Sequence, residues 1–397
     1  MRVVVTGASG NIGTALCRVL PAELPDADVL GIARRVPADE DRAAGARHGG
    51  AGSGGTQRVA AQRGAAQRSE TRTGETRLHE SRAGETRSDG TRAGPGGVSW
   101  LSCDIGAPSA EARLTRAFAG ADAVVHLAWA IQPGMDEPAM RRTNLDGSAH
   151  VLAAAERAGV PHVVVASSVA AYTPADHPVD EDWPCAGVPG STYSLQKAQL
   201  ERMLDGHDVA RVRPCAVVQP DAGAELDRWV LSPLIPPFLI GRRWLPVPLW
   251  NGLRAQVVHA EDVARAITLI LRRRVTGAFN VASGSVLHAD ELAGVLGGFR
   301  LPVPLRLLEG VAWPTWRVGL QPMHPGWLRL ADQASIVDTS RLRALGWRPR
   351  HDAREALAEF VAAVSEGRGS WGPLAPRAGA RWRRLGLARP VRQSQGG

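Results

Sequence analysis

The sequence predicts an α/β protein whose core is a doubly wound parallel sheet, followed by a smaller C-terminal part. Short apolar runs alternate with segments of helical periodicity from residue 2 to about residue 219. Strands that alternate with helices form parallel sheets covered on both faces. The first apolar run also ends in the glycine-rich stretch TGASGNIG, residues 6–13, which leads into an amphipathic helix. This strand, turn and helix is the usual opening of such a sheet.

The remaining elements follow in order along the chain. Gly159 and Pro161 end one expected helix, and Gly206 ends the next. We expect a dinucleotide-binding domain over 1–220, a substrate-binding part over 221–365 with segments that return to the core, and an Arg-rich, disordered tail over 366–397. After the opening unit, the expected strands are 29–32, 98–105, 121–129, 162–168, 210–218 and 277–283, and the expected helices include 144–159, one around 193–197, one from about 257, and 352–364.

Two segments hold most of the formal charge of +8. Residues 43–97 contain nine arginines against five acids, and residues 367–397 contain seven arginines and no acid, so the rest of the chain is slightly acidic. Within 43–97 a Glu-Thr-Arg-like triplet recurs every five residues, a period that fits neither helix nor strand. We expect a disordered insertion, with RNA or partner binding as the alternative. No nucleic-acid partner is expected for the folded part.

Cysteine usage and hydropathy bear on the compartment. Cys17, Cys103, Cys185 and Cys215 stand far apart without a CxxC pair, which favours free thiols in a reducing, cytoplasmic environment. An apolar run begins at residue 2, which leaves no room for a signal peptide. The most apolar stretch, 229–250, is interrupted by prolines and arginines, so no membrane span is expected.

The glycines of TGASGNIG predict a dinucleotide site. Gly7 would permit the tight turn, Gly10 would let the backbone approach a pyrophosphate, and Gly13 would allow the helix to pack closely on the sheet. The N-terminus of the following helix offers free N–H groups to phosphate. These features define a Rossmann-type nucleotide fold.

The end of the second strand bears on the choice of dinucleotide. A carboxylate there would bind the ribose hydroxyls of NAD, but Ala33 occupies that position and Arg34 and Arg35 follow it. Guanidinium groups favour a 2′-phosphate, so NADP is preferred over NAD. The alternative is that both arginines are solvated and reflect the composition of this Arg-rich chain.

Lys197 is the only lysine in the sequence, and it lies four residues after Tyr193, one of two tyrosines. Positions i and i+4 share a helix face, so the two side chains should point the same way. A tyrosine of ordinary pKa, about 10, is a poor base at neutral pH, and a nearby ammonium would lower that pKa. Arginine could not replace the compact ammonium. We therefore expect an acid–base pair.

With these residues in view, the sequence resembles the extended short-chain dehydrogenases/reductases, the NAD-dependent epimerase/dehydratase group. The resemblance rests on TGxxGxxG at 6–13, on YxxxK at Tyr193 and Lys197, and on Ser168 in the segment SSVAAY. It covers nearly the whole chain except 43–97 and the tail. It implies that Tyr193 is the acid/base, that Lys197 binds the nicotinamide ribose, and that Ser168 hydrogen-bonds the reacting oxygen.

The resemblance also implies a set of cofactor contacts. Asp104 corresponds to an adenine-contacting aspartate, and Trp129 stands in a cofactor segment where the family usually has a small residue. The implied cofactor-binding residues are Gly7, Gly10, Asn11, Ile12, Gly13, Arg34, Arg35, Asp104, Ile105, Leu127, Ala128, Trp129, Asn144, Ser167, Tyr193, Lys197 and Pro214.

Departures from the family pattern concern the substrate. Ala255 replaces an arginine typical of nucleotide-sugar enzymes, and Arg213-Pro214-Cys215 lacks an expected asparagine. The apolar residues between Trp229 and Leu245 could line the substrate cleft and favour a less polar substrate, or they could simply pack the smaller part. His126 and His259 are expected to be structural, and no metal site is indicated.

The function predicted is an NAD(P)-dependent oxidoreductase or epimerase that acts on a secondary alcohol or carbonyl, either sugar-like or more apolar. Val169 and Ala170 follow Ser168 where dehydratases of the family usually have acids, which disfavours dehydration. The alternative is a regulatory protein that binds NADP(H) as a redox sensor without turning it over. The partner expected is a small-molecule substrate, and a homodimer stays open.

Overall fold

The computed structural model describes residues 1–36, 92–93, 97–132, 134, 137–224, 242, 244–370 and 372–374. In this described part, eight strands form the main sheet in the order β11-β7-β6-β5-β1-β2-β4-β3. The first seven strands in that order run parallel, and β3 pairs antiparallel with β4 at the edge. Their bounds are β1 Arg2–Thr6, β2 Asp28–Ala33, β3 Arg92–Ala93, β4 Val98–Ser102, β5 Ala123–His126, β6 Val163–Ala166, β7 Ala210–Pro214 and β11 Gly277–Val281.

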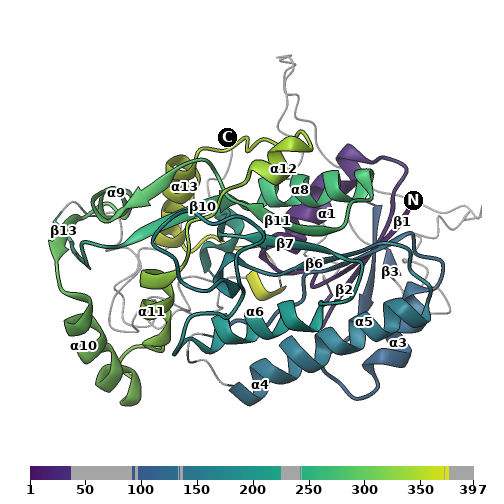
Figure 1. The fold of residues 1–397 in the computed structure, drawn as a ribbon, viewed down its shortest axis with the longest axis horizontal. Helices are drawn as coiled ribbons and strands as arrows, with labels where there is room; N and C mark the ends of the chain where they lie inside the picture. Colours follow the sequence, from purple (N-terminus) through teal and green to yellow (C-terminus); the bar gives the residue numbers. More distant parts are fainter. Residues whose placement is uncertain are drawn as a thin grey trace, which may run out of the picture.

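Helices cover both faces of this sheet, as Figure 1 shows. On one face α1 packs against α8, and on the other α3 packs against α5, with α6 alongside. A hydrophobic cluster lies on each face of the sheet, and alternate residues of β1 belong to different clusters: Val3 and Val5 lie in one and Val4 in the other. The bounds are α1 Asn11–Glu23, α3 Ala110–Phe118, α4 Glu137–Arg141, the π-helical turn η2 Arg142–Asp146, α5 Gly147–Arg157, the 3₁₀ turn η3 Val169–Ala171, α6 Thr192–Met203 and α8 Ala260–Arg273.

The C-terminal part contributes to the main sheet and also builds smaller layers. β11 pairs with β7, so this part returns to the core. A three-stranded sheet, β12-β10-β8, packs against α13, and β13 pairs with β9. The bounds are β8 Ala216–Val218, η4 Pro220–Ala222, β9 Pro246–Leu249, β10 Arg254–His259, β12 Val286–His288, α9 Ala289–Val295, β13 Phe299–Pro302, α10 Leu305–Arg317, α11 Gly326–Gln333, α12 Ser340–Ala344, α13 Ala353–Glu366 and η6 Gly372–Leu374.

Two expected boundaries shift. The predicted disordered insertion extended to residue 97, but Arg92 and Ala93 pair with Trp100 and Ser99 of β4, because backbone pairing at a sheet edge does not require an apolar sequence. The predicted tail began at residue 366, but Leu374 is fully buried against α13. Residues 43–91 and 94–96 of the insertion, residues 371 and 375–397 of the tail, and most of the apolar stretch from Trp229 onward lie outside the described residues.

Among the helices of the described residues, none combines the length and the apolar character that crossing a bilayer requires.

Candidate active site

The N-terminus of α6 is fixed by its own serines. Ser191 is the N-cap and accepts a hydrogen bond from the backbone N–H of Ser194. The hydroxyl of Ser194 donates to the carbonyl of Ala170 at 2.6 Å and accepts from the N–H of Val188 at 2.6 Å. These bonds tie the first turn of α6 to the loop that follows β6. Tyr193 and Lys197 are therefore held at the carboxyl end of the sheet.

Lys197 is buried, with 3% of its surface exposed. Its Nζ donates to the carbonyl of Ala166, the last residue of β6, at 2.9 Å, and lies 3.6 Å from the centroid of the Trp129 ring. Burial lowers the pKa of Lys197 to about 7, while the charge of Glu201 acts in the opposite direction. The side chain of Lys197 therefore exchanges its proton close to neutral pH.

Tyr193 lies between Ser168 and Trp327. Its hydroxyl is hydrogen-bonded to Ser168, and its ring packs on the indole of Trp327 at 5.2 Å between centroids. Burial raises the pKa of Tyr193, and the bond to Ser168 only partly offsets that rise. The expectation that Lys197 lowers this pKa is not met in this structure, because the ammonium is directed at Ala166 and Trp129.

Ser168 follows β6 and is buried. Its Oγ accepts from the N–H of Ala170 at 3.1 Å and makes a long contact of 3.5 Å to the carbonyl of Pro214. The neighbouring Ser167 is also buried, and its N–H donates to Val212 of β7. The two predicted residues Ser168 and Pro214 therefore do meet, at the ends of β6 and β7.

The backbone of the glycine turn packs closely against its neighbours. Gly7 has φ +76°, and a Cβ there would lie 2.5 Å from the backbone nitrogen of Ala128. A Cβ on Gly13 would lie 2.3 Å from the carbonyl oxygen of Gly7, so the helix and turn are in backbone contact. Gly10 is the N-cap of α1 and provides no side-chain cap. The first N–H groups of α1 thus have no side-chain acceptor at the N-cap, which suits a phosphate.

Two other predicted cofactor residues, Asn11 and Asp104, already make polar contacts within the protein. The amide of Asn11 donates to the carbonyl of Val217, and Gln219 donates back to Asn11. Asp104 accepts from the N–H of Gly106 and forms an ion pair with Arg142 at 3.0 Å. These bonds hold the loops after β8 and β4 in place.

Asn144 lies in the π-helical turn η2 and is fully buried. Its Oδ1 accepts from the N–H of Ala130 at 2.6 Å, and its Nδ2 donates to Gln196, the neighbour of Lys197. It therefore positions the segment that carries Leu127, Ala128 and Trp129 rather than facing an open site. Ile12 and Leu127 are half-buried against the core, and Ile105 is buried beside Gly147.

Arg34 and Arg35 lie exposed just after β2, where a ribose-binding carboxylate would otherwise stand. The backbone carbonyl of Arg34 accepts from the hydroxyl of Ser102. Ala33 before them is buried.

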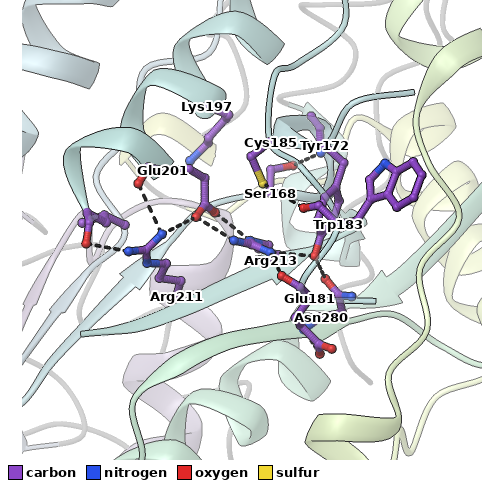
Figure 2. A network of polar contacts seen from close by, with 12 residues as sticks. Ser168, Tyr172, Glu181, Trp183, Cys185, Lys197, Glu201, Arg211, Arg213 and Asn280 are labelled. Atoms are coloured by element: carbon purple, nitrogen blue, oxygen red, sulfur yellow. Dashed lines mark hydrogen bonds and ion pairs between the residues drawn. The ribbon is translucent and has the colours of Figure 1, made fainter. Parts of the chain in front are cut away.

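A buried charge network lies behind Lys197 (Figure 2). Glu201, one helical turn further along α6, accepts from Nε and Nη2 of Arg213, both at 2.8 Å, and from Arg211 at 3.2 Å. Burial opposes ionisation of Glu201, but the hydrogen bonds and charge of Arg213 outweigh it and lower its pKa. Arg213 also donates to the hydroxyl of Tyr172, which donates to Asn280. Sequence reasoning missed this network, although Glu201 stands at i+4 from Lys197.

His259, Glu261 and His351 form a group with metal-ligand chemistry among the described residues. The two imidazoles are stacked, 3.9 Å apart at 26°. Because an ion binds in the plane of each imidazole, stacked rings cannot surround it tetrahedrally. Nδ1 of His259 instead accepts the N–H of Glu261 at the start of α8, and His351 bonds Asp262. The group serves the packing of α8.

Trp327 on α11 was also missed, since no sequence signal connects it to Tyr193. Val188, Ala170 and Leu330 complete its small apolar cluster. The cluster brings the C-terminal part against the candidate acid/base.

The parallel sheet with helices on both faces and the glycine turn after β1 have the architecture of the short-chain dehydrogenases/reductases. The model of the NAD dependent epimerase/dehydratase family matches residues 3–282. The chain belongs to this family.

Relatives agree with that assignment. The chain is 30% identical over 273 residues to a dTDP-glucose 4,6-dehydratase of Streptomyces griseus, covering 66% of this chain and 77% of the relative. It is 27% identical over 245 residues to a 3-diazoavenalumate denitrifying reductase of Streptomyces sp, covering 58% and 76%. The structure of DesIV, a dTDP-glucose 4,6-dehydratase from Streptomyces venezuelae with NAD and TYD bound, is similar with a TM-score of 0.61 and 22% identity, covering 94% and 100%. The last comparison shows the shared fold.

Proposed function

We propose that this protein is an NAD(P)-dependent oxidoreductase or epimerase that interconverts a secondary alcohol and a carbonyl, using Tyr193, Lys197 and Ser168. One continuous set of contacts carries the proposal. Gly7 approaches the backbone of Ala128, the adjacent Trp129 lies under the ammonium of Lys197, and Lys197 bonds the last residue of β6. Ser168 follows that strand and bonds Tyr193. These contacts support the proposal that the glycine turn and the proposed acid–base group serve one site.

A bound nicotinamide would supply or accept the hydride. In reduction, the hydroxyl of Tyr193 donates its proton to the carbonyl oxygen while Ser168 donates a hydrogen bond to that oxygen. In oxidation, Tyr193 must first lose its own proton to solvent, and the phenolate then takes the proton from the alcohol. Lys197 would hold the dinucleotide ribose, and its charge would stabilise the phenolate form of Tyr193. Proton exchange with solvent then restores the phenol.

NADP is the dinucleotide we propose, with NAD as the alternative. Support comes from Arg34 and Arg35, exposed at the end of β2, and from the absence of a carboxylate at Ala33. Similar solved structures hold NAD, which argues the other way. Energy transfer from tryptophan to bound NADPH or NADH compares the two affinities. Tighter binding of NADH than of NADPH refutes the NADP preference. So does an affinity of the double variant Arg34→Ala/Arg35→Ala for NADPH that equals the affinity of wild type.

The substrate we propose carries an apolar or aromatic group beside its carbonyl. Trp327, Val188 and Leu330 form an apolar wall against Tyr193, and Ala255 lacks the charge with which related enzymes hold a diphosphate. A relative named for reduction of 3-diazoavenalumate is consistent with this choice, whereas a relative named for dTDP-glucose is consistent with a sugar nucleotide. A panel of aryl ketones and sugar nucleotides with NADPH, followed by absorbance, decides between them.

The decisive experiment compares wild type with Lys197→Arg and Tyr193→Phe. We expect both variants to lose at least about 100-fold in turnover, a typical contribution of acid–base catalysis, while Tyr193→Phe keeps dinucleotide affinity. Thermal unfolding verifies that each variant is folded. Unchanged turnover in either variant removes that residue from the mechanism. Binding of dinucleotide without turnover of any substrate would instead favour a redox sensor.

We also propose a cytoplasmic location, because the four cysteines are all free thiols and burial raises the pKa of each. A homodimer is the state we would test first, by light scattering of the eluted protein.

A further inference from the structure

Trp129 makes an unusual contact with the only lysine of the chain. The ammonium of Lys197 has three N–H donors, of which one reaches the carbonyl of Ala166 at 2.9 Å. Another side of the ammonium faces the indole, with Nζ 3.6 Å from the ring centroid. The face of an indole carries negative charge density and attracts a cation, most strongly where water is excluded. Lys197 is 3% exposed, so the contact is nearly dry.

The indole is placed to offer its ring face. Trp129 lies three residues beyond the end of β5, and its neighbour Ala128 contacts the Gly7 turn. Its Nε1 is buried and has no hydrogen-bond partner among the residues that the structure describes. Its polar atom thus does not determine its position, and the face of the ring lies against the ammonium.

The other charged or titratable groups around Lys197 compensate its charge poorly. Glu201 on the same helix is already shared by Arg213 and Arg211. His126, on β5, has its pKa lowered to about 3 by burial and by Lys197, so it is neutral. Tyr193 has a raised pKa and is neutral too. The ring face of Trp129, 3.6 Å from Nζ, is thus a further source of negative charge density beside the ammonium.

We propose that Trp129 is a positioning residue that keeps the buried amine of Lys197 protonated. This inference rests on the proposed function for its purpose, but the contact can be tested in the protein without dinucleotide. Burial already brings the pKa of Lys197 to about 7. Loss of a desolvated cation–π contact should lower it by about one further unit, leaving most of the amine neutral at pH 7.

A single lysine makes the measurement direct. Protein grown with lysine labelled at Cε gives one side-chain signal, that of Lys197, whose titration reports its pKa. We compare wild type, Trp129→Phe and Trp129→Leu, with Trp244→Leu as a control because Trp244 is 63% exposed. We expect an upfield ring-current shift of the Cε protons in wild type. The pKa should fall in the order wild type, Trp129→Phe, Trp129→Leu, and the control should titrate as wild type.

Equal pKa values in wild type and Trp129→Leu would overturn the proposal. So would a wild-type signal without the upfield shift, a result that needs no variant at all. If Trp129→Leu does not fold, the comparison of wild type with Trp129→Phe decides by the same criterion. If the pKa of Lys197 falls in the expected order but the protein turns over no substrate, this inference stands and the proposed function is refuted instead.

In the active enzyme, the same variants should move the alkaline limb of the kcat/KM profile to lower pH by a similar amount, since the neutral amine no longer supports the phenolate. A purely structural role for Trp129 would lower activity without moving that limb.

Discussion

His126 is buried beneath the glycine turn with both ring nitrogens satisfied. Nδ1 lies 2.7 Å from the hydroxyl of Thr6, and Nε2 lies 2.9 Å from that of Ser148. Ser148 donates its own proton to the carbonyl of Asn144, so it must accept from Nε2–H. Nδ1 then accepts from Thr6. The network assigns one neutral tautomer, in which both ring nitrogens are already hydrogen-bonded.

This burial makes stability depend on pH. The pKa of His126 is lowered to about 3 when folded, against about 6.5 when unfolded. Between these values the unfolded chain binds a proton that the folded chain does not, so stability falls as pH drops below about 6.5, by up to about 1.4 kcal/mol per unit. We expect the free energy of unfolding, measured by urea unfolding, to change less with pH between roughly pH 6.5 and 5 in His126→Gln than in wild type. A variant slope equal to that of wild type contradicts this, and His177→Gln, at an exposed site, is the control.

Glu201 carries the charge balance of its network. Glu201→Gln keeps the shape but leaves the buried guanidinium of Arg213 without a counter-charge, which should cost about 3–5 kcal/mol. The matched control is Asp205→Asn, which removes an exposed partner of Arg211 and should cost no more than about 1 kcal/mol. Denaturant unfolding measures both. Equal losses would show that the network is solvated rather than buried.

At this scale the sequence predicts that Tyr193 and Lys197 share one helix but not the environment of either side chain. The spacing of Tyr193 and Lys197 follows from helix geometry alone. The orientation of the Lys197 amine depends on Ala166 and Trp129, which come from two other strands and their loops. No local pattern encodes such tertiary contacts, and the expected acidification of Tyr193 failed for the same reason.

The opening strand, turn and helix act as one element around Gly7. Gly7→Ala should destabilise the protein by more than about 1–2 kcal/mol, because its φ of +76° is unfavourable for L residues and its Cβ would overlap Ala128. Gly10→Ala is the matched control for folding: its φ is −82° and its Cβ would lie 3.3 Å from the nearest atom. We expect it to fold but to bind dinucleotide at least about tenfold more weakly, since the backbone must approach the pyrophosphate. Thermal unfolding and titration with dinucleotide separate the two effects. Comparable stability of both variants would contradict the close contact at Ala128.

Elements whose ends are marked by glycine were predicted well. Gly159 and Gly206 both have positive φ, just after α5 and close behind α6. Two elements without such marks were missed: α11, which brings Trp327 to Tyr193, and β3, whose two residues are too few to show a period. Their positions are decided by packing against the rest of the fold.

For the whole molecule, the repeat segment can be tested by removal. β2 and β4 are parallel neighbours, so the connection must return along about five residues of strand, roughly 17 Å. Deleting residues 43–90 leaves about sixteen residues between them, which span this easily. We expect unfolding temperature and dinucleotide affinity to change little. A large loss of either would give the insertion a structural role, and a loss of RNA binding alone would support the alternative function.

The burial of Lys197 has a practical chemical consequence. Every other basic side chain of the Lys/Arg class is arginine, and the lysine amine is covered by Trp129 and β6. In the folded protein Lys197 is 3% exposed, so a reagent that acylates lysine amines finds no open lysine on the chain. Labelling through lysine with biotin or a fluorophore should therefore become possible only when the fold opens, and acylation of this one amine would report that opening.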